Sequence, residues 1–171
     1  MNDALNRRKV VLLDRDGVIN RKAPEGDYVK SWREFEFLPG AVEALARLTR
    51  HGYEVYVVTN QRGIARGLMT RQDLDDIHAR MRAALRRHGV ELGGIYVCPH
   101  GLDDGCDCRK PKPGLLLRAA EEHDFDLGGT VFIGDSPSDA GAGRAAGCRT
   151  VLVGPGRGLP EVVDGLLGEN G

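Results

Sequence analysis

Residues 10–20 read VVLLDRDGVIN, and this stretch carries the strongest indication of the fold. Val10–Leu13 is a short apolar run of the kind that forms a buried strand in a parallel sheet. Asp14 and Asp16 follow at once, and in an extended segment their spacing points both carboxylates to one side. Gly17 then permits a sharp turn. Charge directly after an apolar strand is costly unless a cation binds there, so the stretch also predicts a cation site.

The rest of the chain alternates short runs rich in Val and Ile with longer segments of helical period. Further strands are predicted over 53–58, 95–97, 130–133 and 150–153. Helices are predicted over 41–50, from a cap at Thr70 to a stop at Gly89, from Pro113 onward, and over 139–146. This alternation is typical of an α/β fold, doubly wound, with a mainly parallel sheet covered by helices on both faces. After Gly154 the pattern is too weak to predict an element.

Length and composition limit the classes of function. The chain has 171 residues, the size of one domain, so residues 1–171 are predicted to form a single domain. It has 24 Lys and Arg against 25 Asp and Glu, and a formal charge of -1 creates no global attraction to nucleic acid or an anionic membrane. The apolar run 10–13 is too short for a signal or membrane segment. We therefore expect a cytoplasmic monomer whose partner is a small molecule.

The predicted strands end in polar residues, and in such sheets ligands bind outside the carboxyl ends of the strands. Asp14 and Asp16 with Asp135, from another strand end, would form a hard oxygen site suited to Mg²⁺. A simple turn or a calcium loop is the alternative for the first pair. A calcium loop needs further oxygen ligands at alternate positions, whereas Val18 and Ile19 follow directly, so the EF-hand interpretation fails.

Phosphoryl chemistry suits this set of residues. Beside a bound magnesium ion, Asp14 is placed to be a carboxylate nucleophile toward phosphorus. Asp16 is placed to give a proton to the leaving oxygen and later to take one from water. Thr59, Asn60 and Lys110 would bind the transferring oxygens.

The sequence resembles the haloacid dehalogenase superfamily at four ordered motifs that span nearly the whole chain. These are Asp14-Arg15-Asp16-Gly17-Val18-Ile19-Asn20, Val58-Thr59-Asn60-Gln61, Arg109-Lys110-Pro111, and Gly134-Asp135-Ser136 followed by Asp139. Three further stretches are typical of a smaller family within this superfamily: residues 60–67 (NQRGIARG), 98–100 (CPH) and 106–111 (CDCRKP). They are similar to the D-glycero-D-manno-heptose-1,7-bisphosphate 7-phosphatases and, secondarily, to the histidinol-phosphate phosphatases.

This resemblance implies a role for each matching residue. Asp14 would be the nucleophile, Asp16 the general acid and base, and Thr59 and Lys110 would stabilise the phosphoryl group. Mg²⁺ would be held by Asp14, the backbone carbonyl of Asp16, and Asp135, with Asp139 in a supporting role. The candidate substrate-binding residues are Asp27, Tyr28, Asn60, Gln61, Arg62 and Arg109. Arg62 stands where a small serine is expected and Ser136 where a lysine often follows the aspartate; both departures concern substrate selection.

A second metal site is predicted in the loop 98–110. Cys98 with His100 and Cys106 with Cys108 supply four ligands in two tight pairs, a set that Zn²⁺ binds tetrahedrally and structurally. Free thiols and a surface histidine are the alternative. Zinc would fold this loop and so aim Arg109 and Lys110 at the substrate. The remaining histidines lack paired ligand spacing and are predicted on helix surfaces: His51, His78, His88 and His123.

Three functions stay open at this point. The first is a heptose bisphosphate phosphatase, in which Arg109 and Arg62 bind the second phosphate. The second is a histidinol-phosphate phosphatase, for which the acidic loop Glu25-Gly26-Asp27 could bind the cationic end of the substrate. The third, a non-enzymatic zinc module, is disfavoured by the intact set of aspartates and Lys110. The intervals between the motifs hold one helix and a short loop, so no separate cap domain is expected; loop 21–32 and the zinc loop would cover the site.

Overall fold

The computed structural model describes residues 7–169, and its centre is a five-stranded sheet in which every pair of neighbours is parallel. The strand order is β3-β2-β1-β4-β5. The strands are β1 (Lys9–Leu13), β2 (Tyr53–Asn60), β3 (Gly94–Cys98), β4 (Thr130–Gly134) and β5 (Arg149–Leu152). The predicted α/β class, the parallel sheet and the five predicted strands are confirmed, with bounds that shift by one or two residues.

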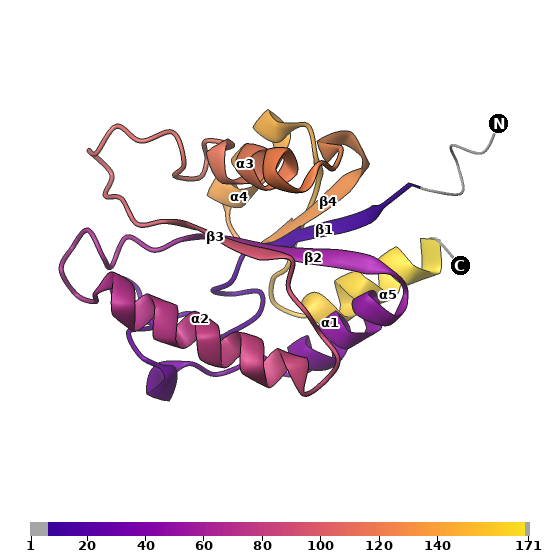
Figure 1. The fold of residues 1–171 in the computed structure, drawn as a ribbon, viewed down its shortest axis with the longest axis horizontal. Helices are drawn as coiled ribbons and strands as arrows, with labels where there is room; N and C mark the ends of the chain where they lie inside the picture. Colours follow the sequence, from indigo (N-terminus) through magenta and orange to yellow (C-terminus); the bar gives the residue numbers. More distant parts are fainter. Residues whose placement is uncertain (1–6, 170–171) are drawn as a thin grey trace.

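Helices cover both faces of the sheet (Figure 1). One face carries α1 (Ala41–Arg50), α2 (Arg71–Arg86) and α5 (Leu159–Glu169), and the other carries α3 (Gly114–His123) and α4 (Pro137–Ala146). Short 3-10 turns lie at η1 (Trp32–Glu34) and η2 (Leu127–Gly129). The buried strand residues alternate between two apolar cores, because Val11 and Leu13 face one helix layer while Val10 and Leu12 face the other.

Local signals explain where the helices begin and end. Thr70 and Asp73 form a reciprocal capping box at the start of α2. Ser136 caps α4 through the Asp139 amide, Pro137 occupies the first turn, and Gly147 ends the helix with a φ of 82°. The helix α5 lies in the tail for which no element was predicted.

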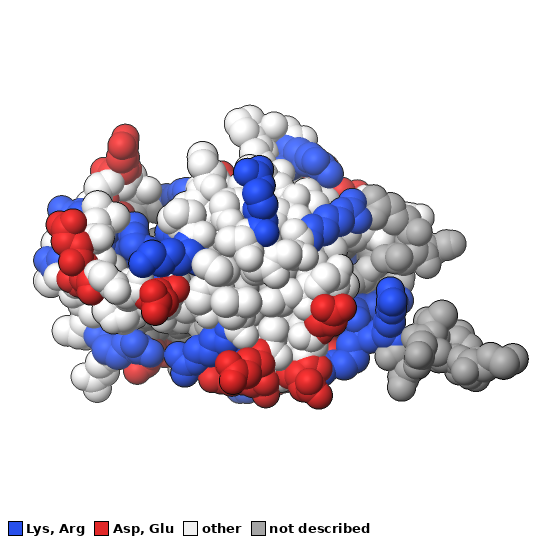
Figure 2. All heavy atoms as spheres, turned by 90° about the horizontal axis from the view of Figure 1, so that it is seen from above, with Lys and Arg blue, Asp and Glu red and all other residues white. Residues whose placement is uncertain are grey.

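The strand order places a topological switch point between β1 and β4, which pair through Leu13 and Ile133 at their carboxyl ends. Residues 14–40 and the segment 61–93 add only loops, η1 and α2 to the layers, so the described chain has no cap domain over this edge. None of the helices in residues 7–169 has the length and apolar character needed to cross a membrane. Acidic and basic side chains are interspersed on the face above α3 and α4 (Figure 2).

Candidate active site

Asp14 and Lys110 meet at the carboxyl end of β1. The backbone N–H of Asp14 donates to the Ile133 carbonyl at 2.9 Å, which extends the pairing of β1 with β4 by one residue. Lys110 is only 2% exposed, and its Nζ lies 3.1 Å from Asp14 Oδ1 and 2.7 Å from Asp139 Oδ1. The same ammonium donates to the Val58 carbonyl at 3.0 Å.

The pKa values of this group follow from burial and mutual charge. Burial raises the pKa of Asp14 to about 7, against the lowering effect of Lys110, and the charges of Asp139 and Asp16 raise it further. For Lys110, burial lowers the pKa, but Asp14 and Asp139 outweigh it and the net shift is upward. Burial raises the pKa of Asp139, and Lys110 more than reverses that effect. Lys110 is therefore a retained buried cation that balances two carboxylates.

Three carboxylates form a site suited to a divalent cation. Carboxylate oxygens of Asp14, Asp135 and Asp139 lie within 4.8 Å of one another. Asp135 Oδ1 is buried and accepts no hydrogen bond from residues 7–169, so its lone pairs are free for a cation. Gly17 has a φ of 88°, and a Cβ there would fall 2.1 Å from Asp135 Oδ2, so only glycine allows this approach. Hard oxygen ligands with one orphaned oxygen fit Mg²⁺.

Asp139 supports this cluster from α4. Its Oδ2 accepts the backbone N–H of Asp135 at 2.9 Å and the Ser136 hydroxyl at 3.1 Å, while Oδ1 contacts Lys110. Gly134 lies so close that a Cβ there would meet the Asp139 carboxylate at 2.6 Å. Asp139 thus orients the backbone of Asp135 and the ammonium of Lys110 at once.

Asp16 lies beside Asp14 and is held by several donors. Its Oδ2 accepts Gln61 Nε2 at 2.9 Å, and the same Nε2 donates to Thr59 Oγ1 at 3.0 Å. Burial would raise the pKa of Asp16, but Arg15, Asn20 and Gln61 outweigh it and lower the pKa below its ordinary value. Gln61, a predicted substrate-binding residue, is fully buried, and its Nε2 bridges Asp16 and Thr59.

Asn60 connects β2 to the loop that presents Lys110. Its Nδ2 donates to the Lys110 carbonyl at 3.2 Å, and its Oδ1 accepts the Lys110 backbone N–H at 3.1 Å. This reciprocal pair fixes the backbone of Lys110 although 50 residues separate the two positions. Asn60 also lines the cavity described next, where it can contact a ligand.

A cavity of about 310 Å³ opens over these groups. Its described lining comprises Asp14, Asp16, residues 22–29, Asn60, Lys110, Asp135, Ser136, Ser138 and Asp139. The predicted substrate residues Asp27 and Tyr28 are in this lining. Arg62 and Arg109 are half-buried and are not among the described lining; Arg109 instead borders a separate cavity of about 240 Å³ beside Cys106.

Lys22 is a lining residue that the sequence analysis missed. Its ammonium lies 2.7 Å from Asp135 Oδ2 and is about half exposed. Lys22 and Lys110 are the cations of the described lining, and Lys110 is engaged by Asp14 and Asp139. Lys22 lies in an irregular loop, where periodicity gives no signal.

Loop 21–32 packs against the segment that carries Gly63 and Arg66, mainly through Tyr28. The Arg66 guanidinium lies 5.9 Å from the centre of the Tyr28 ring and donates to the Gly26 carbonyl at 2.9 Å. The Tyr28 ring also packs closely on Gly63, where a Cβ would lie 2.9 Å from the ring. Asp27 pairs with Lys30 at 2.8 Å.

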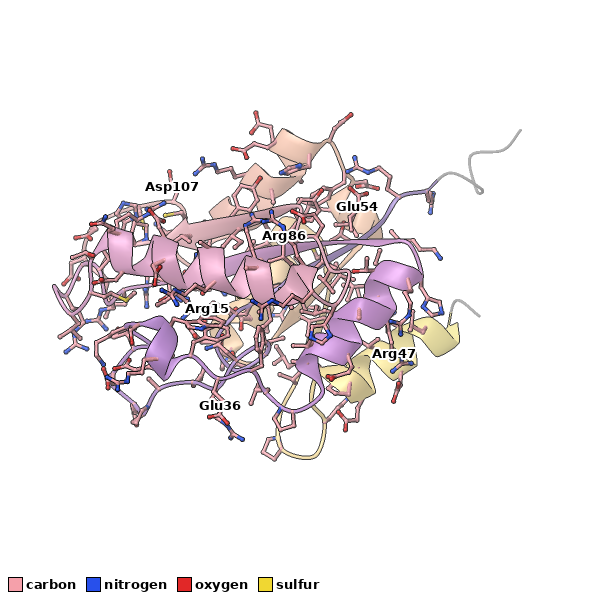
Figure 3. All side chains as sticks on the ribbon, turned by 60° about the horizontal axis from the view of Figure 1, so that its bottom comes forward. Arg15, Glu36, Arg47, Glu54, Arg86 and Asp107 are labelled. Carbon is pink, nitrogen blue, oxygen red and sulfur yellow. The ribbon has the colours of Figure 1, made fainter. Side chains whose placement is uncertain are left out.

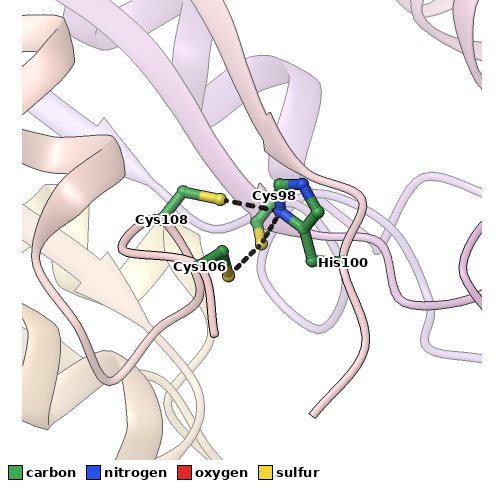
Figure 4. A group of neighbouring side chains, drawn as sticks. All are labelled: Cys98, His100, Cys106 and Cys108. Carbon is green, nitrogen blue, oxygen red and sulfur yellow. Dashed lines mark hydrogen bonds between the residues drawn. The ribbon is translucent and has the colours of Figure 1, made fainter. Parts of the chain in front are cut away.

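The predicted zinc ligands converge at the end of β3 (Figure 4). The Cys98 and Cys106 Sγ atoms are 3.7 Å apart, and His100 Nδ1 lies 3.6 Å from Cys98 Sγ and 3.2 Å from Cys108 Sγ. All four ligand atoms lie within 4.8 Å of one another. Ligands held about 2.0–2.3 Å from a tetrahedral zinc ion lie about 3.3–3.8 Å apart, so the spacing fits Zn²⁺.

His78 was predicted on a helix surface, and this prediction was wrong. The residue is 8% exposed, and its Nε2 lies 3.0 Å from Nη1 of Arg15. His78 follows Ile77 and precedes Met81 by three positions, so it falls on the apolar stripe of α2. The helical period that predicted the core contacts of α2 could therefore have placed His78 inside.

Comparison with known proteins identifies the family. The D-glycero-beta-D-manno-heptose-1,7-bisphosphate 7-phosphatase of Pseudomonas aeruginosa is 49% identical over 152 residues, which cover 89% of this chain and 84% of that protein. This chain belongs to the heptose-1,7-bisphosphate 7-phosphatase family. A family model described as HAD-hyrolase-like also matches residues 107–166. The resemblance carried by the four motifs is thus confirmed.

The same family provides a solved structure of similar shape. The D,D-heptose 1,7-bisphosphate phosphatase of B. bronchiseptica, crystallised with magnesium and phosphate, aligns with a TM-score of 0.88 at 41% identity. The alignment covers 94% of this chain and 99% of that one. A D-glycero-alpha-D-manno-heptose-1,7-bisphosphate 7-phosphatase of Mycobacterium tuberculosis is 43% identical over 150 residues, 84% of this chain and 78% of that protein. Relatives of the family therefore carry names with either anomer.

Proposed function

We propose that this protein is a single-domain, magnesium-dependent phosphatase that removes the 7-phosphate of D-glycero-D-manno-heptose 1,7-bisphosphate. The observation that carries the proposal is the group of Asp14, Lys110, Asp135 and Asp139, which lines a cavity large enough for a phosphate ester. The family membership supplies the substrate class.

In the proposed reaction Asp14 attacks phosphorus through Oδ2, because Oδ1 already accepts the Arg15 N–H and contacts Lys110. The bond from phosphorus to the ester oxygen breaks, Asp16 gives its proton to that oxygen, and the alcohol leaves. Water then attacks the phosphoaspartate, Asp16 accepts a proton from it, and the P–O bond to Asp14 breaks to release inorganic phosphate. Thr59 accepts a hydrogen bond from Gln61, which leaves its own hydroxyl proton free for a phosphoryl oxygen.

Magnesium would be held by Asp14, the Asp16 backbone carbonyl and Asp135, where it would neutralise charge on the phosphate and the carboxylates. Lys110 supplies a fixed positive charge on the other side of Asp14 and needs no rearrangement, because two carboxylates and the Val58 carbonyl already hold it. A bisphosphate needs a second cation, which we assign to Lys22 in the cavity lining. Arg109 and Arg62 lie outside the described lining, and we assign them to the part of the substrate that extends beyond it.

The second candidate is a histidinol-phosphate phosphatase. Glu25 and Asp27 line the cavity and could contact a cationic substrate. However, Asp27 is already paired with Lys30 at 2.8 Å, and the lysine offsets its negative charge. The charge available to histidinol is thereby reduced, and the bisphosphate is the better match.

Phosphate release tests the assignment. Metal-replete protein should be assayed with both anomers of the heptose bisphosphate, with histidinol phosphate and with simple sugar monophosphates, and Asp14→Asn should be the inactive control. The expected result is the highest kcat/KM for one of the bisphosphates and release of a single phosphate per molecule. Equal or better hydrolysis of histidinol phosphate would overturn the substrate assignment, and no phosphate release from any ester would overturn the enzyme.

We also propose a structural zinc ion at Cys98, His100, Cys106 and Cys108. The ligand spacing supports it, and the position explains its use, since Lys110 lies two residues beyond Cys108. Lys112 donates to the Cys106 carbonyl at 2.7 Å, which ties the chain after Lys110 back to the ligand loop. Elemental analysis of protein purified without chelators should give one zinc per chain, and its absence would remove this site from the proposal.

A further inference from the structure

Arg15, between the two aspartates, is a fully buried cation at 0% exposure. Arg15 is not in the described lining of the cavity, and its guanidinium contacts His78 of α2, so its side chain lies in the core under that helix. Figure 3 shows Arg15 between α2 and the segment that carries η1. Burying a guanidinium costs free energy unless its donors find hydrogen-bond partners, so the partners of Arg15 indicate its role.

The donors of the Arg15 guanidinium are directed at two different side chains. Its Nε and Nη2 both donate to Asp16 Oδ1, at 3.1 Å and 2.7 Å. Its Nη1 lies 3.0 Å from Nε2 of His78 on α2, and the guanidinium lies 5.8 Å from the Phe35 ring centre. Burial and the charge of Arg15 lower the pKa of His78 to about 3, so the imidazole is neutral and Nε2 can accept.

The two oxygens of Asp16 differ as a result. Oδ1 accepts three hydrogen bonds, two from Arg15 and one from Asn20 Nδ2 at 2.9 Å. Within residues 7–169, Oδ2 accepts one, from Gln61. An oxygen with three donors has no free lone pair for a proton, whereas Oδ2 keeps this capacity and borders the cavity through Asp16.

We infer that Arg15 and His78 are positioning residues that fix Asp16 Oδ1 and leave Oδ2 as the oxygen that carries the catalytic proton. The inference rests on the proposed phosphatase function. His78 anchors one edge of the guanidinium to α2, and that anchor aims the other edge at Asp16. In the first step a protonated Oδ2 gives its proton to the ester oxygen as the bond from that oxygen to phosphorus breaks, and Asp16 returns to the carboxylate form that Arg15 stabilises.

Leaving-group dependence separates this role from a general effect on folding. A phenolate leaving group needs the proton of Asp16 more than the weakly basic 4-nitrophenolate does, while phenyl phosphate and 4-nitrophenyl phosphate have nearly the same shape. The probes are these two esters, and kcat/KM is measured for both with wild type, His78→Met and His78→Gln. The ratio of the two kcat/KM values within one preparation is independent of the folded fraction.

His78→Met keeps a long side chain but removes the acceptor, whereas the amide oxygen of His78→Gln can accept from Arg15. We expect His78→Met to lower kcat/KM for phenyl phosphate by about tenfold to a hundredfold more than for 4-nitrophenyl phosphate. His78→Gln should restore most of the wild-type ratio. If His78→Met yields no soluble protein, Arg15→Lys provides the same test, since the single nitrogen of an ammonium cannot occupy the positions of Nε and Nη2 at Asp16 and of Nη1 at His78.

Equal losses for both esters, or a ratio that His78→Gln does not restore, would overturn the positioning role. The heptose bisphosphate is assayed in parallel. Wild-type protein that hydrolyses the aryl esters but not the bisphosphate would contradict the proposed substrate. The ratio of the two esters would still test the role of Arg15 and His78. Wild-type protein that hydrolyses neither ester nor the bisphosphate would overturn both.

Discussion

Replacing Lys110 by Met tests whether the buried ammonium is as important to folding as to chemistry. Lys110 lies between Asp14 and Asp139 and is almost fully buried. Methionine has similar length but no charge, so Lys110→Met leaves two carboxylates without their buried cation. We expect the variant to be inactive and clearly less stable than wild type in magnesium-free buffer at pH 8.

The size of the effect follows from the contacts. Removing one partner of a buried ion pair costs about 3–5 kcal/mol. For a chain of 171 residues, each kcal/mol lowers Tm by about 2–4 °C, so Tm should fall by about 6–20 °C. Urea unfolding at several pH values and calorimetry measure the loss in free energy of unfolding and in Tm.

The loss should depend on pH. In wild type, Lys110 lowers the pKa of Asp139, and this contribution to stability is present above the unfolded pKa and is lost as pH falls. In Lys110→Met, burial without a cation raises both carboxyl pKa values in the folded state, which destabilises the protein increasingly as pH rises. The difference between variant and wild type should therefore be largest near pH 8 and shrink toward pH 5.

Lys112→Met is the matched control, because that lysine is about half exposed and lies two positions along the same loop. It should change the free energy of unfolding by less than about 1 kcal/mol. The double variant Lys110→Met with Asp139→Asn should lose less stability than the sum of the single variants, since one uncompensated charge is removed with the cation. A Lys110→Met protein that unfolds like wild type at pH 8 would refute the reasoning.

Three further predictions concern the nucleophile, the zinc loop and the second phosphate. Asp14→Asn should reduce turnover by about a million-fold with little change in Tm, since an amide cannot attack phosphorus, and measurable phosphoenzyme in that variant would contradict it. Cys106→Ser should lose zinc and lower Tm, measured by elemental analysis and calorimetry, whereas Cys148→Ser should keep its zinc. Lys22→Ala and Arg109→Ala should each lower kcat/KM for the bisphosphate about tenfold more than for a small monophosphate; equal losses would exclude that cation from the second phosphate.

Much of the fold follows from local pattern, because the buried strands of a parallel sheet are short runs of apolar residues. The run 10–13 and the helix 41–50 needed no tertiary information, and both were predicted within one residue. The helix α5 was missed although Leu159, Val162, Val163 and Leu166 are buried and recur at helical spacing. Three glycines within residues 154–158 precede this stripe and weaken its signal.

The candidate site was predictable where chemistry depends on a residue directly after a strand. Asp14 and Asp135 meet because β1 and β4 are neighbours in the sheet. Lys22 was missed because its position depends on loop 21–32, whose path is set by Tyr28 packing against Gly63 and Arg66. Those contacts join residues more than 30 positions apart, and no periodicity in the chain describes them.

The residues that hold the site differ from those that act in it, and the sequence motifs do not separate the two groups. Asn60 ends β2 and Gln61 follows it, yet Asn60 binds the backbone of Lys110 while Gln61 donates to Asp16 and Thr59. Asn60 Nδ2 and Gln61 Nε2 thus both donate within the protein. A motif match predicts that such residues bind substrate, because it gives their position in the sequence and not the direction of their side chains. The direction of each side chain decides its role, since a donor already directed at a carboxylate stabilises the site before any substrate enters.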